Sequence, residues 1–213
     1  MTAVHDEDAS LMLRVQQGEL GAFEQLVERH RQPIFNFVQR MIHDPAETED
    51  VAQQVFVQVW KAADRYRVAS RFTTWLFTIA RNLCLNELRR RGRHPTESLE
   101  AEHDTGESTM AREFEDVRNP GVAEEVMLGE LTVKIEEALA ALPESQRAAI
   151  LLFREQEMPY EEIARVLEVS VSATKSLIHR GRETLKARLK AYLRTGAWDS
   201  SEAAAETFPG NRV

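Results

Sequence analysis

Apolar residues recur every three or four positions along most of the chain, which is the spacing of amphipathic helices. Helices are expected over residues 8–17 and 21–42, with Gly18 ending the first of them. Pro33 lies inside the second helix and removes one backbone hydrogen bond, so a kink is expected there. The start of the chain is therefore predicted to be helical.

Two further helices are expected before residue 94. Asp44, Pro45 and Glu47 form a helix start signal, in which the aspartate caps the helix and Glu47 can reach back to the cap. This helix is expected to run to about Asp64, with its apolar side mainly in the core: Val51, Val55, Phe56, Val59 and Trp60. A loop follows, and residues 71–93 form the next helix. Its expected core stripe is Trp75, Leu76, Ile79, Ala80 and Leu83.

The second half of the chain ends in a characteristic pair of helices. The turn at residues 168–170 separates a short helix from a basic one, and either Ser170 or Ser172 can cap the basic helix. This order predicts a helix-turn-helix, although a plain helical hairpin has the same pattern. The helices expected before the turn are 125–142, 144–156 and 160–167.

The charges are segregated along the chain. The formal net charge is −8, yet residues 71–93 hold six arginines and one acid, and residues 170–194 hold seven bases and one acid. Residues 95–125 hold ten acids and two arginines, without sustained periodicity, which is typical of a flexible linker. Two basic blocks around an acidic one favour two DNA-facing modules.

The predicted fold is therefore all-α, with two small helical domains joined by a flexible acidic linker, the second domain being a helix-turn-helix. The expected divisions are a first domain over 1–94, the linker over 95–125, the second domain over 126–195 and a polar tail over 196–213.

The stretch 71–93 carries the clearest candidate chemistry. Thr78, Asn82, Asn86, Arg89 and Arg93 recur on one face of the expected helix. Arginines bind phosphates, asparagine amides can hydrogen-bond base edges, and an aromatic ring can stack on an unpaired base. The alternative is an ordinary solvated helix with Trp75 in the core.

Other chemistry finds little support in the sequence. Cys84 is the single cysteine and lies on an apolar side, so we expect a buried structural thiol and no disulfide. The six histidines show no metal-ligand spacing, and no phosphate loop or nucleophile motif is present, so no metal, cofactor or catalysis is expected. The first ten residues lack an apolar signal, and no run approaches the roughly 18 apolar residues of a membrane span. A soluble cytoplasmic protein without membrane insertion is expected.

Four segments together resemble the extracytoplasmic-function (ECF) group of bacterial sigma factors in the sigma-70 superfamily, which carry only regions two and four. The segments are DPAETEDVAQQVFVQVW (44–60), RFTTWLFTIARNLCLNELRRR (71–91), LPESQRAAILL (142–152) and PYEEIARVLEVSVSATKSLIHRGRETLKARL (159–189). The resemblance implies a non-enzymatic factor that binds core RNA polymerase and directs promoter-specific transcription initiation, typically in a stress response. It implies that the minus-35 element is recognised as duplex and the minus-ten element as melted strand.

The resemblance also implies roles for particular residues. Contact with the clamp helices of the polymerase beta-prime subunit falls to Asp50, Gln53, Gln54 and Gln58. The minus-ten element is bound by Val68, Ala69, Ser70, Arg71, Trp75, Asn82, Asn86, Arg89 and Arg90. The minus-35 element is bound by Ser172, Lys175, Ser176, His179, Arg180 and Arg182. Residues 142–153 are implied to meet the beta flap, and an anti-sigma factor is an implied partner, able to hold the protein at the membrane.

Three residues depart from the family pattern. Glu168 stands in the turn where glycine is usual, Leu177 stands where arginine is frequent, and Gly181 lies inside the basic helix. A glycine there costs about 1 kcal/mol of helix propensity against alanine.

Two other functions share part of this pattern. A sigma mimic would bind an anti-sigma factor and no DNA, but the intact basic faces count against it. A stand-alone helix-turn-helix regulator would have no use for residues 44–93.

Overall fold

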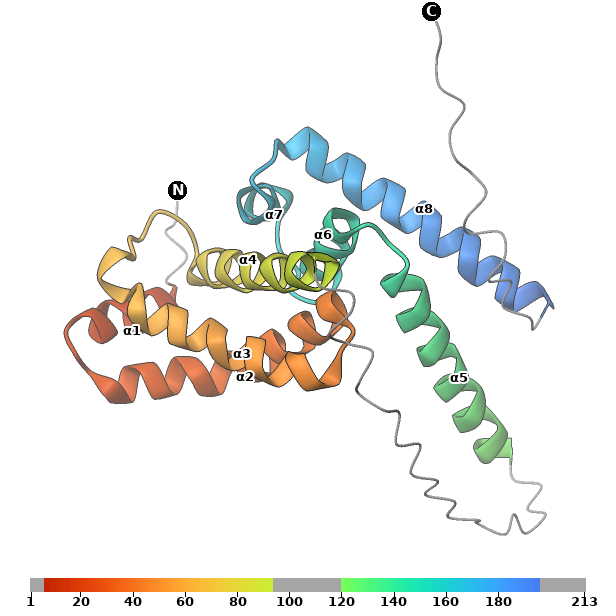
Figure 1. The fold of residues 1–213 in the computed structure, drawn as a ribbon, viewed down its shortest axis with the longest axis horizontal. Coiled ribbons are helices and arrows are strands. Elements are labelled where there is room, and N and C mark those ends of the chain that lie inside the picture. Colours follow the sequence, from red (N-terminus) through yellow and green to blue (C-terminus); the bar gives the residue numbers. More distant parts are fainter. Residues whose placement is uncertain (1–5, 94–119, 196–213) are drawn as a thin grey trace, which may run out of the picture.

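The structure is a computed structural model that describes residues 6–93 and 120–195, and every regular element in those two ranges is a helix (Figure 1). The elements are α1 (Glu7–Gln16), α2 (Leu20–Ile42), α3 (Pro45–Lys61), the 3-10 helix η1 (Ala63–Arg65), α4 (Phe72–Arg93), α5 (Pro120–Ala140), α6 (Glu144–Arg154), α7 (Tyr160–Leu167) and α8 (Val171–Thr195). The expected all-α fold is confirmed. Most of the expected linker and the whole polar tail lie outside the described residues.

Helices α1 to α4 form a bundle in which α2 packs against the other three. The Asp44 cap of α3 is confirmed, because its carboxylate accepts hydrogen bonds from the backbone N–H groups of Ala46 and Glu47. The Glu47 carboxylate accepts a hydrogen bond from Arg90 of α4 and does not reach back to the cap. Helix α2 runs continuously through Pro33. Helix α3 ends at Lys61, before the expected Asp64, and η1 fills the difference.

The expected core stripe of α4 is partly wrong. Trp75, Ile79 and Leu83 are only half-buried, whereas Phe77 and Cys84 are fully buried. The reason is that α4 is covered from two directions, by α2 and α3 on one side and by α7 on another, so its buried face is wider than one stripe (Figure 1). Burial raises the pKa of the Cys84 thiol to about 12, as expected for a structural cysteine.

Trp60 also departs from the expectation of core. Its side chain is 43% exposed, and its ring packs edge-on against Phe23 with 5.0 Å between ring centroids. Val55 and Val59 on the same helix are buried as expected, and Phe56 is half-buried. The helical spacing gave the correct face of α3, but Trp60 lies at its edge.

The helix-turn-helix consists of α7, the turn at residues 168–170 and α8. Ser170 is the cap, because its Oγ accepts a hydrogen bond from Ala173 N at 3.1 Å. Gly181 is buried where α8 crosses α6, and a Cβ at this position would lie 2.5 Å from Ile150 Cδ1. Close approach of the two helices therefore accounts for the glycine inside α8.

The two halves of the chain share one hydrophobic core, which runs from α1–α4 into α6, α7 and α8. Two arginines reinforce the junction at the end of α2. Arg40 binds the carboxylates of Glu136 and Glu155, and burial raises the pKa of Glu155. Arg147 of α6 donates to the backbone carbonyl of Met41 at 2.7 Å.

Glu168 adopts the left-handed conformation, with a φ of 57°, at the position where family members usually carry glycine. A side chain in this region costs about 1–2 kcal/mol. We therefore expect Glu168→Gly to raise the free energy of unfolding by about 1 kcal/mol in urea titrations, since glycine relieves the strain. Glu168→Ala is the control, because alanine keeps the Cβ. Equal stability of the glycine and alanine variants would contradict the strain.

Candidate nucleic-acid interface

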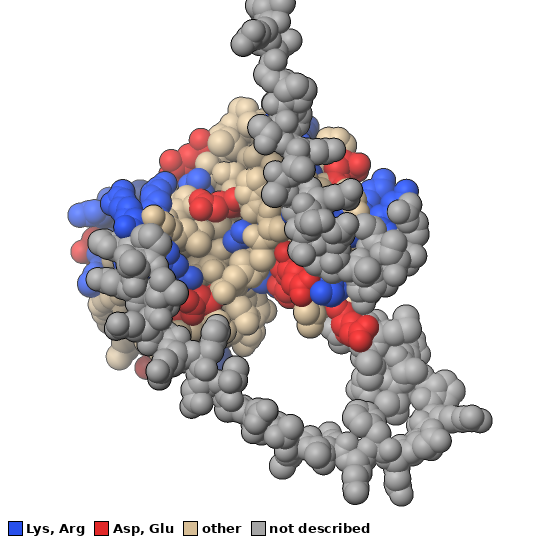
Figure 2. Space-filling model, turned by 45° about the vertical axis from the view of Figure 1, so that its right-hand side comes forward, with Lys and Arg blue, Asp and Glu red and all other residues tan. Residues whose placement is uncertain are grey.

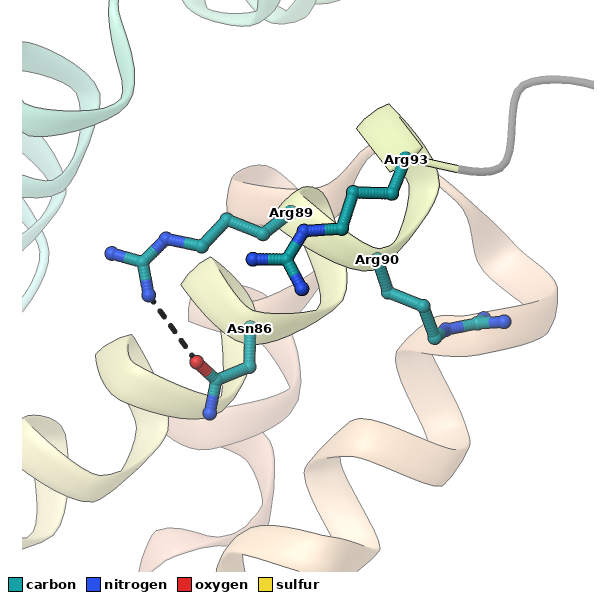
Figure 3. A pocket seen from close by; sticks show the side chains of 4 residues that line it. All are labelled: Asn86, Arg89, Arg90 and Arg93. Atoms are coloured by element: carbon teal, nitrogen blue, oxygen red, sulfur yellow. Dashed lines mark hydrogen bonds between the residues drawn. The ribbon is translucent and has the colours of Figure 1, made fainter.

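The carboxyl-terminal half of α4 presents a polar, basic surface. Asn82, Asn86, Arg89 and Arg93 are all exposed on it. An open pocket of about 320 Å³ is lined by Asn86, Arg89, Arg90 and Arg93. Figure 3 shows Arg89 and Arg93 reaching over the same side of the helix as Asn86, with Arg89 donating to the Asn86 side-chain oxygen at 3.4 Å. Guanidinium and amide groups on one face can bind a phosphate and a base edge together.

Arg90 differs from the other arginines of this pocket, and its side chain points away from them (Figure 3). Its guanidinium donates to both oxygens of Glu87, at 2.8 and 2.9 Å, and to Glu47 of α3 at 3.0 Å. Glu87 also accepts from Arg91, and hydrogen bonds from Arg90 and Arg91 hold the pKa of its carboxyl below the usual range. Arg90 therefore ties α4 to α3 and is a weaker candidate for DNA than Arg89.

Glu87 is a residue that the sequence reasoning missed. It is only 9% exposed, yet it is the acid that organises Arg90 and Arg91. Its spacing of three and four residues from these arginines was the available signal. Arg91 also pairs with Asp44, the cap of α3.

The loop before α4 is held by a side chain at the end of α1. The Gln16 side-chain amide donates to the carbonyls of Ala63 and Tyr66, at 2.7 and 3.0 Å. Tyr66 is buried beside Trp75, with 5.0 Å between ring centroids, and burial raises the pKa of Tyr66 to about 12. Of the small residues in this loop, Val68 and Ala69 are exposed and Ser70 is half-buried. Trp75 itself is half-buried.

Arg71, at the start of α4, already has a partner in the structure. Its Nε lies 3.2 Å from Oε1 of Glu162, which belongs to α7 in the other half of the chain. The other candidates on α4 make no such contact with α7 in the described residues. Arg71 is nevertheless an exposed residue, and 51% of its side chain remains accessible.

Helix α8 presents the second basic face. Ser172, Lys175, His179, Arg180 and Arg182 are exposed, and Ser176 is half-buried. Thr174 and Ile178 are buried as expected. Leu177 packs against the core, which accounts for an apolar residue where family members often carry arginine.

Lys175 has a support that the sequence did not reveal. Its ammonium lies 5.6 Å from the centre of the Tyr160 ring, which stacks on Phe153. The two rings thus hold the amino-terminal end of the α8 face in place. In Figure 2, lysine and arginine side chains gather at the left edge and at the right edge of the molecule.

Helix α3 carries the expected polymerase-binding residues. Asp50, Gln53 and Gln54 are exposed, and Gln58 is half-buried. Val57 and Trp60 are exposed on the same helix. The surface is therefore less polar than the sequence reasoning assumed.

Within the described residues, no three His, Cys, Asp or Glu side chains lie where they could hold a metal ion together. The described helices also include none that is both long enough and apolar enough to cross a membrane.

In the described residues the chain is helical and carries a basic helix-turn-helix and a second basic helix, which are features of DNA-binding proteins. Residues 26–94 match the family Sigma-70 region 2, and residues 132–185 match Sigma-70, region 4. The chain belongs to the ECF group of the sigma-70 family. It is a transcription initiation factor that gives RNA polymerase promoter specificity, and it is not an enzyme.

Individual relatives are similar over nearly their whole length. The RNA polymerase sigma-H factor of Pseudomonas aeruginosa is 34% identical over 189 residues, covering 89% of this chain and 97% of the relative. The ECF RNA polymerase sigma-E factor of Escherichia coli is 33% identical over 192 residues, covering 88% and 96%. The fold resembles CnrH in its complex with the cytosolic domain of CnrY, with a TM-score of 0.63 and 26% identity, covering 87% of this chain and 99% of CnrH.

The different partners of Arg89 and Arg90 lead to a direct comparison. We expect Arg89→Ala to reduce the salt dependence of DNA binding, as the slope of log K against log salt, by roughly 0.7–0.9 for one lost phosphate contact. Arg90→Ala should leave the slope nearly unchanged and lower Tm, because it removes the link to Glu87 and Glu47. Holoenzyme binding to a promoter with a mismatched bubble gives the slopes. Equal slope losses in both variants would contradict the distinction.

Proposed function

We propose that the two halves of this sigma factor divide promoter recognition between them. The α8 face binds the minus-35 element as duplex, with Arg180 and Arg182 reaching the major groove. The α4 face binds the minus-ten element after the strands separate. The observation that carries this proposal is the placement of Asn82 and Asn86 beside Arg89, on the exposed side of a helix whose other sides are packed.

The proposal gives each group on α4 a separate task. Arg89 and Arg93 contact phosphates, which fixes the position of the strand without specifying its sequence. Asn82 and Asn86 hydrogen-bond base edges, and the loop with Val68 and Ala69 leaves room for an extruded base. Capturing such a base offsets the few kcal/mol of its unpairing.

Polymerase docking is assigned to the exposed side of α3, centred on Asp50, Gln53 and Gln54, and to α6 for the beta flap. An anti-sigma factor is the proposed regulator, because the similar protein CnrH is found with the cytosolic domain of CnrY. Such a partner would hold this chain in the cytoplasm at the membrane surface. In vitro transcription with core polymerase tests the proposal as a whole, and no promoter-specific transcript would contradict it.

The docking surface is tested by reversing its charge. We expect Asp50→Arg with Gln54→Arg to abolish association with core polymerase in size-exclusion chromatography, because positive charge replaces the acceptor groups. Both side chains are exposed, so the free energy of unfolding should change by at most about 0.5 kcal/mol. Glu24→Arg with Gln25→Arg is the matched control, since both residues are exposed on α2. Normal holoenzyme formation by the α3 variant would contradict the assignment of polymerase docking to α3.

The melting surface is tested at Asn82. We expect Asn82→Ala to leave polymerase binding and Tm nearly unchanged and to slow open-complex formation on duplex promoter, because a base contact is lost. A template with a mismatched minus-ten bubble should recover part of the rate, since the unpairing cost is already met. Permanganate footprinting of bubble thymines gives the rates, with Gln39→Ala on α2 as the control. A wild-type melting rate for Asn82→Ala would show that this face does not hold the strand.

A further inference from the structure

Helix α1 contacts both ends of the loop that precedes α4. At the amino-terminal end of α1, Asp6 Oδ2 accepts a hydrogen bond at 2.8 Å from the backbone N–H of Phe72, the first residue of α4. At the other end of α1, the Gln16 side-chain amide donates to the carbonyl of Tyr66 at 3.0 Å. Residues 67–71 lie between these contacts and belong to no helix. One helix therefore fixes where this loop begins and where it ends.

Asp6 serves two helices with one carboxylate. Its Oδ1 accepts hydrogen bonds from the backbone N–H groups of Asp8 and Ala9, which caps α1. Its Oδ2 satisfies the N–H of Phe72, one of the first donors of α4, which lack a partner within their own helix. The negative charge also lies where both helix dipoles are positive. The start of α4 is thus tied to the position of α1.

Helix α1 is itself fixed in the first bundle, where it lies beside η1 and α4 (Figure 1). Its apolar side chains are buried in the core: Ala9, Leu11, Met12 and Val15. Asp8 binds Arg29 and His30 of α2, at 2.9 and 2.8 Å. The match to Sigma-70 region 2 begins at residue 26, after α1, so the family match gives α1 no part in promoter recognition.

The hydrogen bonds within the loop are local. The backbone N–H of Ala69 donates to the carbonyl of Arg67 at 2.7 Å, and the Arg67 guanidinium donates to the carbonyl of Tyr66 at 2.8 Å. Bonds of this kind do not set the separation of the loop ends, which follows from the two contacts with α1. A loop whose ends are already held loses less entropy when it binds a ligand.

We propose that α1 positions this loop for minus-ten recognition, with Asp6 and Gln16 as positioning residues that set the space for the extruded base. The proposal rests on the proposed function of the loop. Asp6 and Gln16 do not touch the DNA, because they act through the backbone of Tyr66 and Phe72. The loss of either contact changes which base fits best, and not only how fast the promoter opens.

Hydrogen exchange of the free protein tests the support of the loop without DNA. Three backbone N–H groups of residues 66–72 donate hydrogen bonds in the structure. We expect Gln16→Ala and Asp6→Asn to speed exchange over this peptide roughly fivefold, the effect of one lost hydrogen bond. Asparagine keeps a single side-chain oxygen, so it can cap α1 or α4 but not both. Unchanged exchange in either variant would overturn the proposal.

Open-complex formation by the holoenzyme tests the effect on recognition. The probes are four duplex promoters that carry A, C, G or T at the minus-ten position where the wild-type protein shows its strongest base preference. We expect Gln16→Ala and Asp6→Asn to reduce the ratio of rates between the preferred and the least preferred base roughly fivefold. A general loss of structure would slow all four promoters by the same factor. Equal slowing on all four would overturn the positioning role, and so would wild-type rates.

The same promoters are measured with two matched controls, Gln17→Ala and Glu7→Gln. Gln17 adjoins Gln16 and is exposed, and Glu7 adjoins Asp6 but binds Arg29 of α2. Both controls should keep the wild-type base preference. Gln16→Lys is the rescue variant, because an ammonium on a chain of similar length still donates to carbonyls. A lysine variant as unselective as the alanine variant would contradict the role of the amide donor.

The failure of this proposal and that of the proposed function are distinguishable. A wild-type holoenzyme without base preference at any minus-ten position contradicts the proposed function. A wild-type preference that persists unchanged in Gln16→Ala and Asp6→Asn contradicts the positioning role of α1 alone.

Discussion

The buried guanidinium of Arg147 determines how the two halves of this chain meet. It donates to the carbonyls of Leu139 and Leu142 at 3.0 and 2.9 Å, to that of Ala140 at 2.5 Å, and to that of Met41 at 2.7 Å. All four acceptors lie at or just after the carboxyl ends of α5 and α2, where backbone carbonyls lack helical partners and the helix dipole is negative. Burial lowers the pKa of Arg147, but an arginine stays protonated in a protein. One cation therefore joins two helix ends, and α6 is fixed against α2.

The position of α6 has consequences along the rest of the fold. Helix α7 follows α6 after a short connection and comes to lie on α4. The same α4 thus serves three neighbours: α2 and α3 inside its own bundle, and α7 from the other half. Its amino-terminal part is enclosed, and its carboxyl-terminal part remains open and basic. Packing and recognition are separated along the length of one helix.

The elements of the fold could be predicted from the sequence where the signals are local. The cap at Asp44, the helix over Tyr160–Leu167 and the cap at Ser170 follow from residues within a few positions of one another. The ECF family was also recognisable, because its motifs occur as contiguous segments. The exposure of Asn82, Asn86 and Arg180 followed from helical spacing alone.

The remainder depended on contacts that spacing does not encode. Helical periodicity identifies the apolar face of a helix but not the element that packs against it. The packing of α7 against α4 and the exposure of Trp60 were therefore missed. Glu162 could not be assigned to Arg71 from the sequence, because the pairing depends on how the two halves dock. Glu87 was misjudged for a different reason: it was counted as one charge in a basic helix, although its position sets which arginines are free.

The junction at Glu162 joins parts of a single chain, and this has a consequence for the cell. A contact within one chain is a first-order equilibrium, so the fraction of molecules in which α7 lies on α4 does not depend on the concentration of the protein. Only a partner that binds one arrangement of the two halves better than another can change that fraction.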